Sequence, residues 1–350
     1  MKVATFYPGP SRVYSNLTEF IYEAYMKGVM SINHRSDAFM EMMFETKQIL
    51  KEKLLIPTNY EIVFTSSATE SWEIIAQSLT GRHSQHFYNG AFGEKWRLYA
   101  SHLVKTGSVE FELNAEMNPD EVSEVADMIC VTQNETSNGT QVSMESLKAL
   151  KEHAGDRLVA IDATSSMAGI HLDFSLGDVW YASVQKCFGL PAGMGVMVLS
   201  PAAIERAYEL NEKSHYNSLV NILDNAKKNQ TPYTPNVLNI YLIKRTQEVS
   251  KGIRFVHERA LKRYQTLSEV IAELDDFEFL VSNPAVRSQT VLAIKCEDPQ
   301  QVRIKSEEYG IILGNGYGQW KPETFRIANF PAIKSKEIEK LNKHLLQHYQ

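Results

Sequence analysis

Asp162 and Lys186 are the two residues whose types and spacing best suit chemistry. Asp162 ends the apolar run 158–161, and Lys186 lies just past a second apolar run, 179–182. Both runs read as buried strands of a parallel sheet, and polar residues at the carboxyl ends of such strands face a ligand crevice. A lysine amine can form a Schiff base with an aldehyde, and a carboxylate can keep a pyridine nitrogen protonated. The pair therefore predicts a site for pyridoxal 5'-phosphate (PLP), with Lys186 and Asp162 as its catalytic residues.

Taken singly, each residue also has an ordinary structural interpretation. An aspartate at a strand end commonly forms a turn or caps a helix, and a lysine after a strand commonly lies at the surface. The sequence around Lys186 is more specific, because Gln185-Lys186 leads into the glycine-rich turn 189–195 and then into an apolar strand, 196–199. This order of strand, lysine, glycines and strand resembles the class V aminotransferases, which are fold-type I PLP enzymes. The resemblance implies that Gln185 also contacts the cofactor.

The pattern of the whole chain fits the fold that this resemblance implies. Strands and helices alternate from residue 61 to residue 199, as in an α/β domain built on a parallel sheet. After a long helical stretch, a second α+β unit is expected, with strands at 277–281, 289–295, 311–314 and 324–328. We therefore expect a mostly parallel-sheet PLP-binding domain over residues 16–250 and a smaller α+β C-terminal domain over residues 251–350. An N-terminal Pro/Gly arm, residues 1–15, would join them.

The strand expected at 61–65 breaks into Ser66-Ser67-Ala68-Thr69, and a helix follows. Small hydroxyl residues at a strand-to-helix turn present backbone N–H groups and hydroxyls to an anion. The turn would thus hold the PLP phosphate through Ser67, Ala68 and Thr69, and the resembled family has its phosphate turn at this point in the order. An ordinary helix cap with a capping box explains the same residues, and both interpretations can hold together.

Two further turns follow expected strands. Phe92 comes directly after Gly90-Ala91, where an aromatic ring could stack on a pyridine ring, and the resembled enzymes have a ring-stacking aromatic there. The strand 128–132 runs into 133–139, which resembles the family's Glu-Thr/Ser-Ser-x-Gly turn. The resemblance implies that Thr136 hydrogen-bonds the cofactor's ring hydroxyl and that Asn134 lines the loop, although an ordinary polar turn has the same spacing.

Three cationic side chains could bind a substrate anion. Arg326 lies in the apolar strand 324–328, where an arginine is unusual unless it is paired. A bidentate clamp on a substrate carboxylate suits its type and place, and the family has its carboxylate-binding arginine in this late strand. A structural salt bridge is the alternative. His34 and Arg35 precede a helix that Ser36 could cap, and they suit carboxylate or phosphate, although a solvated loop also explains them.

Gln230 and Thr231 open the Pro-punctuated segment 230–236, which alone reads as a turn. In related enzymes a Thr-Pro turn at this place reaches across a dimer interface to the neighbour's PLP phosphate. Gln230 and Thr231 match those positions, and His34-Arg35 matches others that cross the interface. The resemblance therefore implies a homodimer with shared active sites, and a symmetric dimer is also the commonest assembly.

Composition excludes several classes of function. The chain has 350 residues, is 43% hydrophobic and carries a net charge of -6, so neither a nucleic-acid nor a membrane partner is expected. No apolar run reaches the roughly 18 residues of a membrane helix, and the N-terminus does not read as a signal. Cys130, Cys187 and Cys296 show neither metal-ligand spacing nor a disulfide framework, so no metal site is expected. The default is a reduced, cytoplasmic enzyme.

The resemblance implies a transaminase that moves an amino group between an amino acid and a 2-oxo acid. Within the family, His34-Arg35-Ser36 and the run 329–332 look most like phosphoserine aminotransferases, which implies O-phosphoserine and 2-oxoglutarate as substrates in serine biosynthesis. The chain departs from that pattern in three places. Gly318-Gln319-Trp320-Lys321 has one cation in place of two, the turn 66–69 lacks a common arginine, and Phe92 stands where tryptophan is usual. Serine or alanine with glyoxylate or pyruvate is therefore the alternative.

Two further alternatives belong to other classes. A PLP lyase of the cysteine desulfurase or kynureninase type is one, but a desulfurase needs a mobile nucleophilic cysteine. Cys187 is expected to point away from its neighbour Lys186, and Cys296 ends a strand, so neither lies in a long flexible loop. A non-catalytic relative that binds or regulates is the other. It would be favoured by loss of Lys186, Asp162 or Arg326, and all three are present.

Overall fold

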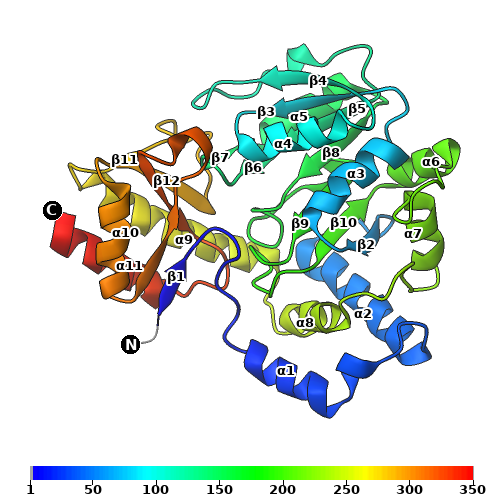
Figure 1. The fold of residues 1–350 in the computed structure, drawn as a ribbon, viewed down its shortest axis with the longest axis horizontal. Coiled ribbons are helices and arrows are strands. Elements are labelled where there is room, and N and C mark those ends of the chain that lie inside the picture. Colours follow the sequence, from blue (N-terminus) through cyan, green and yellow to red (C-terminus); the bar gives the residue numbers. More distant parts are fainter. Residues whose placement is uncertain (1–2, 350) are drawn as a thin grey trace.

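The computed structural model describes residues 3–349, which form two sheets, a small hairpin and the helices around them (Figure 1). The larger sheet has seven strands in the order β2-β10-β9-β8-β5-β3-β4. Their bounds are β2 Glu61–Thr65, β3 His83–Tyr88, β4 Lys105–Glu110, β5 Met128–Thr132, β8 Leu158–Asp162, β9 Val179–Ser183 and β10 Gly195–Leu199. The hydrophobic pattern predicts β2, β5, β8, β9 and β10 to within one residue, whereas the K-T-G-S-V-E sequence of β4 is too polar to indicate a strand.

Six of the seven strands are parallel, and β10 runs antiparallel to both of its neighbours, β2 and β9. The chain passes from β9 to β10 through residues 184–194 without a helix. A short connection of this kind joins antiparallel strands, whereas a parallel pair needs a longer crossover. The expected mostly parallel α/β sheet is confirmed, but extending the parallel pattern to residue 199 is wrong for this one strand.

Helices cover both faces of the larger sheet, because successive side chains of its strands point to opposite faces. In β5, Met128 and Cys130 join one apolar cluster, while Ile129 and Val131 join another. The first cluster includes residues of α3 (Ala68–Ser78), α4 (Ala91–Ala100), α6 (Pro201–Leu210) and α7 (Leu219–Ala226). The second includes residues of α2 (Asp37–Leu54), α5 (Met144–Ala154) and α8 (Val237–Glu248). Because helices pack on both faces of the sheet, its strands are held in place, and so are the polar residues at their carboxyl ends.

The smaller sheet has the order β1-β13-β14-β12-β11. Its strands are β1 Ala4–Phe6, β11 Glu278–Phe279, β12 Val291–Lys295, β13 Ile311–Asn315 and β14 Thr324–Ala328, and its helices are α9 Ile253–Ala272, α10 Pro299–Glu308 and α11 Ser335–Tyr349. The predicted domain boundary at residue 250 falls in the turn between α8 and α9. Figure 1 shows this sheet beside the larger one, and the N-terminal strand β1 forms one of its edges.

The N-terminal arm contains a strand that the sequence pattern does not indicate. β1 pairs in parallel with β13, which is about 300 residues away along the chain. Three residues are too few to show a period of two, so only the distant partner reveals the strand. Beyond β1 the arm runs along the loop after β9, where Ser11 N donates to Gln185 O at 3.0 Å and Tyr14 N donates to Gly189 O at 3.0 Å. The arm therefore links the smaller sheet to the segment that carries Lys186.

The remaining helices are α1 (Leu17–Met26) and the short 3₁₀ turns η1 (Val29–Ser31), η2 (Pro119–Glu121), η3 (Phe174–Leu176) and η4 (Gly318–Trp320). Ser36 caps α2 as predicted, since its hydroxyl accepts from Phe39 N at 3.3 Å. No helix within residues 3–349 has the length and apolar character needed to cross a bilayer.

Candidate active site

A cavity of about 480 Å³ lies where the carboxyl ends of the larger sheet meet the arm and the smaller sheet. Nine of the residues predicted for the site line it: Ala68, Thr69, Phe92, Asn134, Thr136, Asp162, Gln185, Lys186 and Arg326. Ser67 adjoins them as the N-cap of α3. Residues far apart in the sequence thus meet at one edge, as the rule for the carboxyl ends of parallel strands predicts.

Lys186 is buried in this cavity at 7% exposure. Its Nζ donates to Thr136 Oγ1 at 2.7 Å and lies 5.2 Å from the centre of the Phe92 ring. Burial lowers the pKa of Lys186 to about 8, although the negative charges of Asp162 and Glu135 oppose the shift. A lysine with so low a pKa is partly neutral near neutral pH, as a nucleophilic or proton-transferring amine must be.

Asp162 ends β8 and is also buried. Its Oδ1 accepts from Thr164 N at 2.8 Å. Burial raises the pKa of Asp162, while the hydrogen bonds from Thr164 and the charge of Lys186 act in the opposite direction. Behind it, the Tyr181 hydroxyl accepts from Trp72 Nε1 at 2.8 Å. The carboxylate therefore has a fixed orientation and would gain from a cationic partner in the cavity.

The hairpin β6 (Asn134–Glu135) and β7 (Thr140–Gln141) forms another wall. Thr136 Oγ1 lies 3.0 Å from Ser165 Oγ, and Asn134 Nδ2 donates to the same hydroxyl at 2.7 Å. The buried Glu135 carboxylate accepts from the backbone N–H groups of Phe92, Gly93 and Ser137 at 2.9–3.1 Å. Glu135 thereby ties the start of α4, with Phe92, to the hairpin that carries Thr136. The sequence does not single out Glu135.

Arg326 enters the cavity from β14 and is 5% exposed. Its Nε donates to Asn315 O and its Nη1 to Thr136 O, each at 2.7 Å. Within residues 3–349 it forms no ion pair, so the salt bridge considered from the sequence is absent. Burial lowers the pKa of Arg326 to about 10, against the opposing effects of Tyr7, Glu135 and Tyr317. A fixed, buried cation without a carboxylate partner is suited to binding an anionic ligand.

The start of α3 forms the end of the cavity near Thr69. Ser67 Oγ accepts from Glu70 N at 3.1 Å, which is the cap predicted as one interpretation of the turn. The backbone N–H groups of Ala68 and Thr69 have no hydrogen-bond partner within the described chain. Free N–H groups at the beginning of a helix favour an anion such as phosphate. Cap and anion cradle are therefore compatible here.

Four predicted residues lie away from the cavity: His34, Arg35, Gln230 and Thr231. Arg35 is exposed, and its Nη1 donates to Asn225 Oδ1 at 3.0 Å and to Gln230 Oε1 at 2.6 Å. Thr231 Oγ1 donates to Tyr233 O at 2.6 Å. The structure thus brings Arg35 and Gln230 together but not to Lys186 of the same chain. Their predicted role in a shared site remains a prediction.

The cavity also contains residues that the sequence reasoning does not select. Thr132 and Ser183 lie at the carboxyl ends of β5 and β9, so the rule applied to Asp162 could have found both. Tyr317 stacks on Phe92 with ring centres 5.1 Å apart, and its hydroxyl accepts from Lys95 Nζ at 2.7 Å. No local pattern indicates Tyr317, because its place depends on the pairing of β13 with β14.

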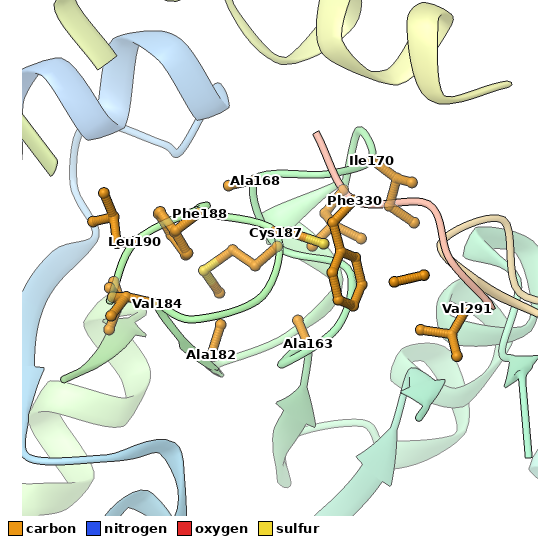
Figure 2. Packing of buried hydrophobic residues seen from close by; sticks show 14 of the residues in the cluster. Ala163, Ala168, Ile170, Ala182, Val184, Cys187, Phe188, Leu190, Val291 and Phe330 are labelled. Atoms are coloured by element: carbon orange, nitrogen blue, oxygen red, sulfur yellow. The ribbon is translucent and has the colours of Figure 1, made fainter. Parts of the chain in front are cut away.

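The cysteines stand apart from the cavity. Cys187 is fully buried in the apolar cluster that also contains Ala163 and Phe330, and Figure 2 shows its side chain close to that of Phe330. Its Sγ donates to Ser165 O at 3.2 Å, and burial raises the pKa of the thiol. Cys296 also lies outside the cavity, and burial raises its pKa to about 12. No group of residues within 3–349 has the composition and spacing of a metal site.

Known proteins share both the sequence pattern and the fold. A family model described as Aminotransferase class-V matches residues 7–322. Phosphoserine aminotransferases of Rhodococcus opacus and Corynebacterium glutamicum are 27% and 28% identical over 96% and 95% of this chain, and over 92% and 91% of their own lengths. A crystal structure of a phosphoserine aminotransferase from Cytophaga hutchinsonii superposes with a TM-score of 0.96 at 31% identity, covering 99% of both chains. An aspartate aminotransferase of Thermus thermophilus, at 21% identity and a TM-score of 0.86, shares the fold.

Proposed function

The chain belongs to the class V aminotransferases and is a PLP-dependent transaminase, and from this premise we propose that its substrates are O-phosphoserine and 2-oxoglutarate. The observation that carries this choice is the pair of cations that line the cavity besides Lys186, namely the buried Arg326 and the exposed Lys321, neither of which forms an ion pair within residues 3–349. Phosphoserine has a carboxylate and a dianionic phosphate, which two cations can bind together. The relatives named phosphoserine aminotransferase support the same choice.

The residues of the cavity fit PLP. Thr132 Oγ1 and Asn134 Oδ1 are buried without a hydrogen-bond partner within the described chain, although both residues line the cavity. Buried polar atoms normally have partners, so these two point to a polar ligand. When bound, PLP supplies an electron sink for the bond that breaks at the substrate α-carbon. Lys186 would hold the cofactor's aldehyde carbon and Asp162 its pyridine nitrogen.

We propose the other cofactor contacts from the family resemblance and from the residues that line the cavity. Phe92 would stack on the ring, Thr136 would bind the ring hydroxyl, and Asn134 and Gln185 would line its sides. The turn Ser67-Ala68-Thr69 would bind the phosphate through its free N–H groups. The neutral Lys186 Nζ would move a proton between the substrate α-carbon and the cofactor, while Arg326 would hold the substrate carboxylate.

We further propose a homodimer in which His34, Arg35, Gln230 and Thr231 act in the partner's site. Arg35 and Gln230 form a polar cluster that is exposed or half-buried in one chain and lies outside that chain's cavity. On α1, three large side chains are exposed to solvent: Tyr22 at 66%, Tyr25 at 70% and Met26 at 63% exposure. Gathered apolar side chains on a surface favour an interface, which supports the assembly.

Steady-state kinetics with a panel of amino donors tests the substrate. We expect kcat/KM for phosphoserine, with 2-oxoglutarate as acceptor, to exceed that for serine by at least about a hundredfold, since the missing phosphate leaves a charged site unpaired. Equal values for the two donors would favour the alternative substrates, serine or alanine with glyoxylate or pyruvate. Gln319 and Trp320, which are neutral where two cations are usual, are the observation in favour of that alternative.

A further inference from the structure

A second cavity, of about 300 Å³, lies between the arm, the turn from α8 to α9, and the segment after β14. The residues that matter for its chemistry are Tyr14, Lys251, Phe255, Arg259, Arg263 and Pro331. None of them lines the cavity of Lys186. The proposed transamination leaves this second cavity without a role.

The second cavity is rich in uncompensated positive charge. Arg259 and Arg263 are four residues apart on α9, which places them on one face of that helix, and Lys251 lies just before the helix N-cap. Within residues 3–349 none of the three forms an ion pair, whereas Lys262, on the same helix, pairs with Glu258 at 2.7 Å. Like charges gathered without a counter-charge repel one another, so an anion between them would be stabilising.

Arg263 is the fixed part of this cluster, at 4% exposure. Its Nε donates to Asn329 Oδ1 at 2.8 Å, and its Nη2 donates to the carbonyl oxygens of Asn329 and Phe330 at 3.3 Å. Its Nη1 has no partner in the described chain and is not enclosed by protein, so it is open to the cavity that the side chain lines. Burial and the neighbouring Arg259 lower the pKa of Arg263 to about 10.

The beginning of α9 adds to the same field. Gly252 is the N-cap, no side chain caps the helix, and its first turn has no acidic residue. The free N–H groups of a helix start carry partial positive charge. A helix start usually bears an acidic residue or a capping oxygen, and here Lys251 stands beside it instead. Phe255 and Tyr14 provide the aromatic part of the cavity wall.

We propose that this cavity binds a small organic anion, with its carboxylate or phosphate group between Arg259, Arg263 and the start of α9, and its carbon skeleton against Phe255 and Tyr14. The site adjoins the catalytic loop, because Tyr14 N donates to Gly189 O at 3.0 Å and the Tyr14 ring packs against Gly189, where an added Cβ would meet it at 2.8 Å. A ligand at this place therefore contacts the segment of the arm that holds the Lys186 loop in place.

Isothermal titration calorimetry with two probes, inorganic phosphate and succinate, tests the proposal. The protein is first reduced with borohydride while its cofactor is bound, so that the cofactor phosphate cannot exchange with the probe. The test variant combines Lys251→Gln with Arg259→Gln, two exposed positions at which folding is not at risk. The matched control combines Lys262→Gln with Lys343→Gln, which removes two exposed charges elsewhere. The comparison of the two variants is repeated on unreduced protein, so it does not depend on the cofactor assignment.

We expect at least one probe to bind at a saturable site in the wild type and in the control, and at least tenfold more weakly in the Lys251→Gln/Arg259→Gln variant. Binding of succinate alone would assign a carboxylate ligand, and binding of phosphate alone would assign a phosphate ester. Equal affinity in the two variants, or no saturable binding of either probe that depends on Lys251 and Arg259, would overturn the proposal. The second result includes the case in which a partner subunit covers the cavity.

Discussion

The cavity around Lys186 and the cluster around Arg35 both contain cations matched to polar groups, but their surroundings differ. Lys186 and Arg326 are 7% and 5% exposed, and burial shifts the pKa of each downward. Arg35 is exposed, and its guanidinium donates hydrogen bonds to the neutral side-chain amides of Asn225 and Gln230. The first region gathers its cations in the cavity of one chain, whereas the groups of the second region lie outside that cavity.

From this difference we infer a division of roles between the two regions. Residues that react must be buried in a fixed geometry, so one chain's sheet edge supplies them. Residues that recognise the distal part of a substrate can come from a second surface that closes over the first. If the chain is divided in this way, damage to the first region stops the reaction with every substrate, while damage to the second changes the choice of substrate.

The largest effect should come from Lys186→Ala. The loss of the group that holds the cofactor and moves the proton should lower kcat by several orders of magnitude, as usual for a central catalytic group. The fold should remain, as measured by circular dichroism and thermal unfolding, because alanine leaves the surrounding hydrogen bonds of Asp162 intact. Lys343→Ala, at an exposed lysine of α11, is the control. Near-normal turnover of the Lys186→Ala protein would contradict the claim that the cavity around Lys186 carries the reaction.

Arg326→Ala should have the next largest effect. Truncating a buried cation that binds a substrate carboxylate should lower kcat/KM for every amino acid donor, by an amount equivalent to about 2–5 kcal/mol of activation free energy. Arg326→Lys keeps the charge but not the two-pronged geometry and should recover part of the loss. The ratio of phosphoserine to serine activity should stay constant, which steady-state kinetics with the two donors will show. A selective loss of one donor would contradict the carboxylate role.

Arg35→Ala should sharpen the contrast between the two regions, because we expect it to lower activity with phosphoserine only. With the partner chain covering Arg35, its removal should lower kcat/KM for phosphoserine by about 2–4 kcal/mol and barely change that for serine. Equal losses for both donors would argue against a phosphate contact.

Mixed dimers refolded from Lys186→Ala and Arg35→Ala chains test whether Arg35 acts across the interface. About one intact site per mixed dimer should return if the two residues of a site come from different chains. Confirmed mixed dimers without recovery would contradict the shared site.

The smallest expected effect concerns the pH at which the Lys186 amine loses its proton. The pKa of Lys186 is lowered to about 8 from an ordinary 10.5, so its amine becomes neutral, and thus nucleophilic, as the pH rises through about 8. Competitive labelling of the cofactor-free protein with acetic anhydride, followed by peptide mapping, should give Lys186 a midpoint near pH 8. Exposed lysines should label with midpoints above about pH 10. In the same window the unfolded chain binds more protons, so this group makes stability rise between about pH 8 and 10.5. A midpoint of Lys186 at or above that of exposed lysines would refute the shift.

Local sequence predicts several residues of the cavity, because they follow an apolar run at a strand end. Asp162 and Lys186 could be found in this way, and Thr132 and Ser183 follow from the same rule, whereas Thr136 is implied by the family resemblance of its turn. Arg326 is evident because a charge inside an apolar strand needs a reason. These inferences depend on the order of apolar and polar residues within a few positions, which can be read from a single sequence.

Contacts between distant segments could not be predicted. Tyr317 reaches Phe92 only because β13 pairs with β14, and the arm becomes a strand only because β13 offers an edge. The antiparallel direction of β10 depends on the path of residues 184–194 rather than on its own apolar sequence. Likewise, Arg263 reads as an ordinary helix residue until Asn329 and Phe330 pack over it.

The attachment of the cofactor to Lys186 is the central claim, and borohydride reduction with peptide mapping tests it most directly. Purified protein loaded with PLP is reduced, digested and analysed by mass spectrometry for the pyridoxyl group. We predict a single labelled peptide that contains Lys186, at about one group per chain, and no such label in Lys186→Ala. A pyridoxyl group on another lysine, or equal labelling of the variant, would contradict this attachment.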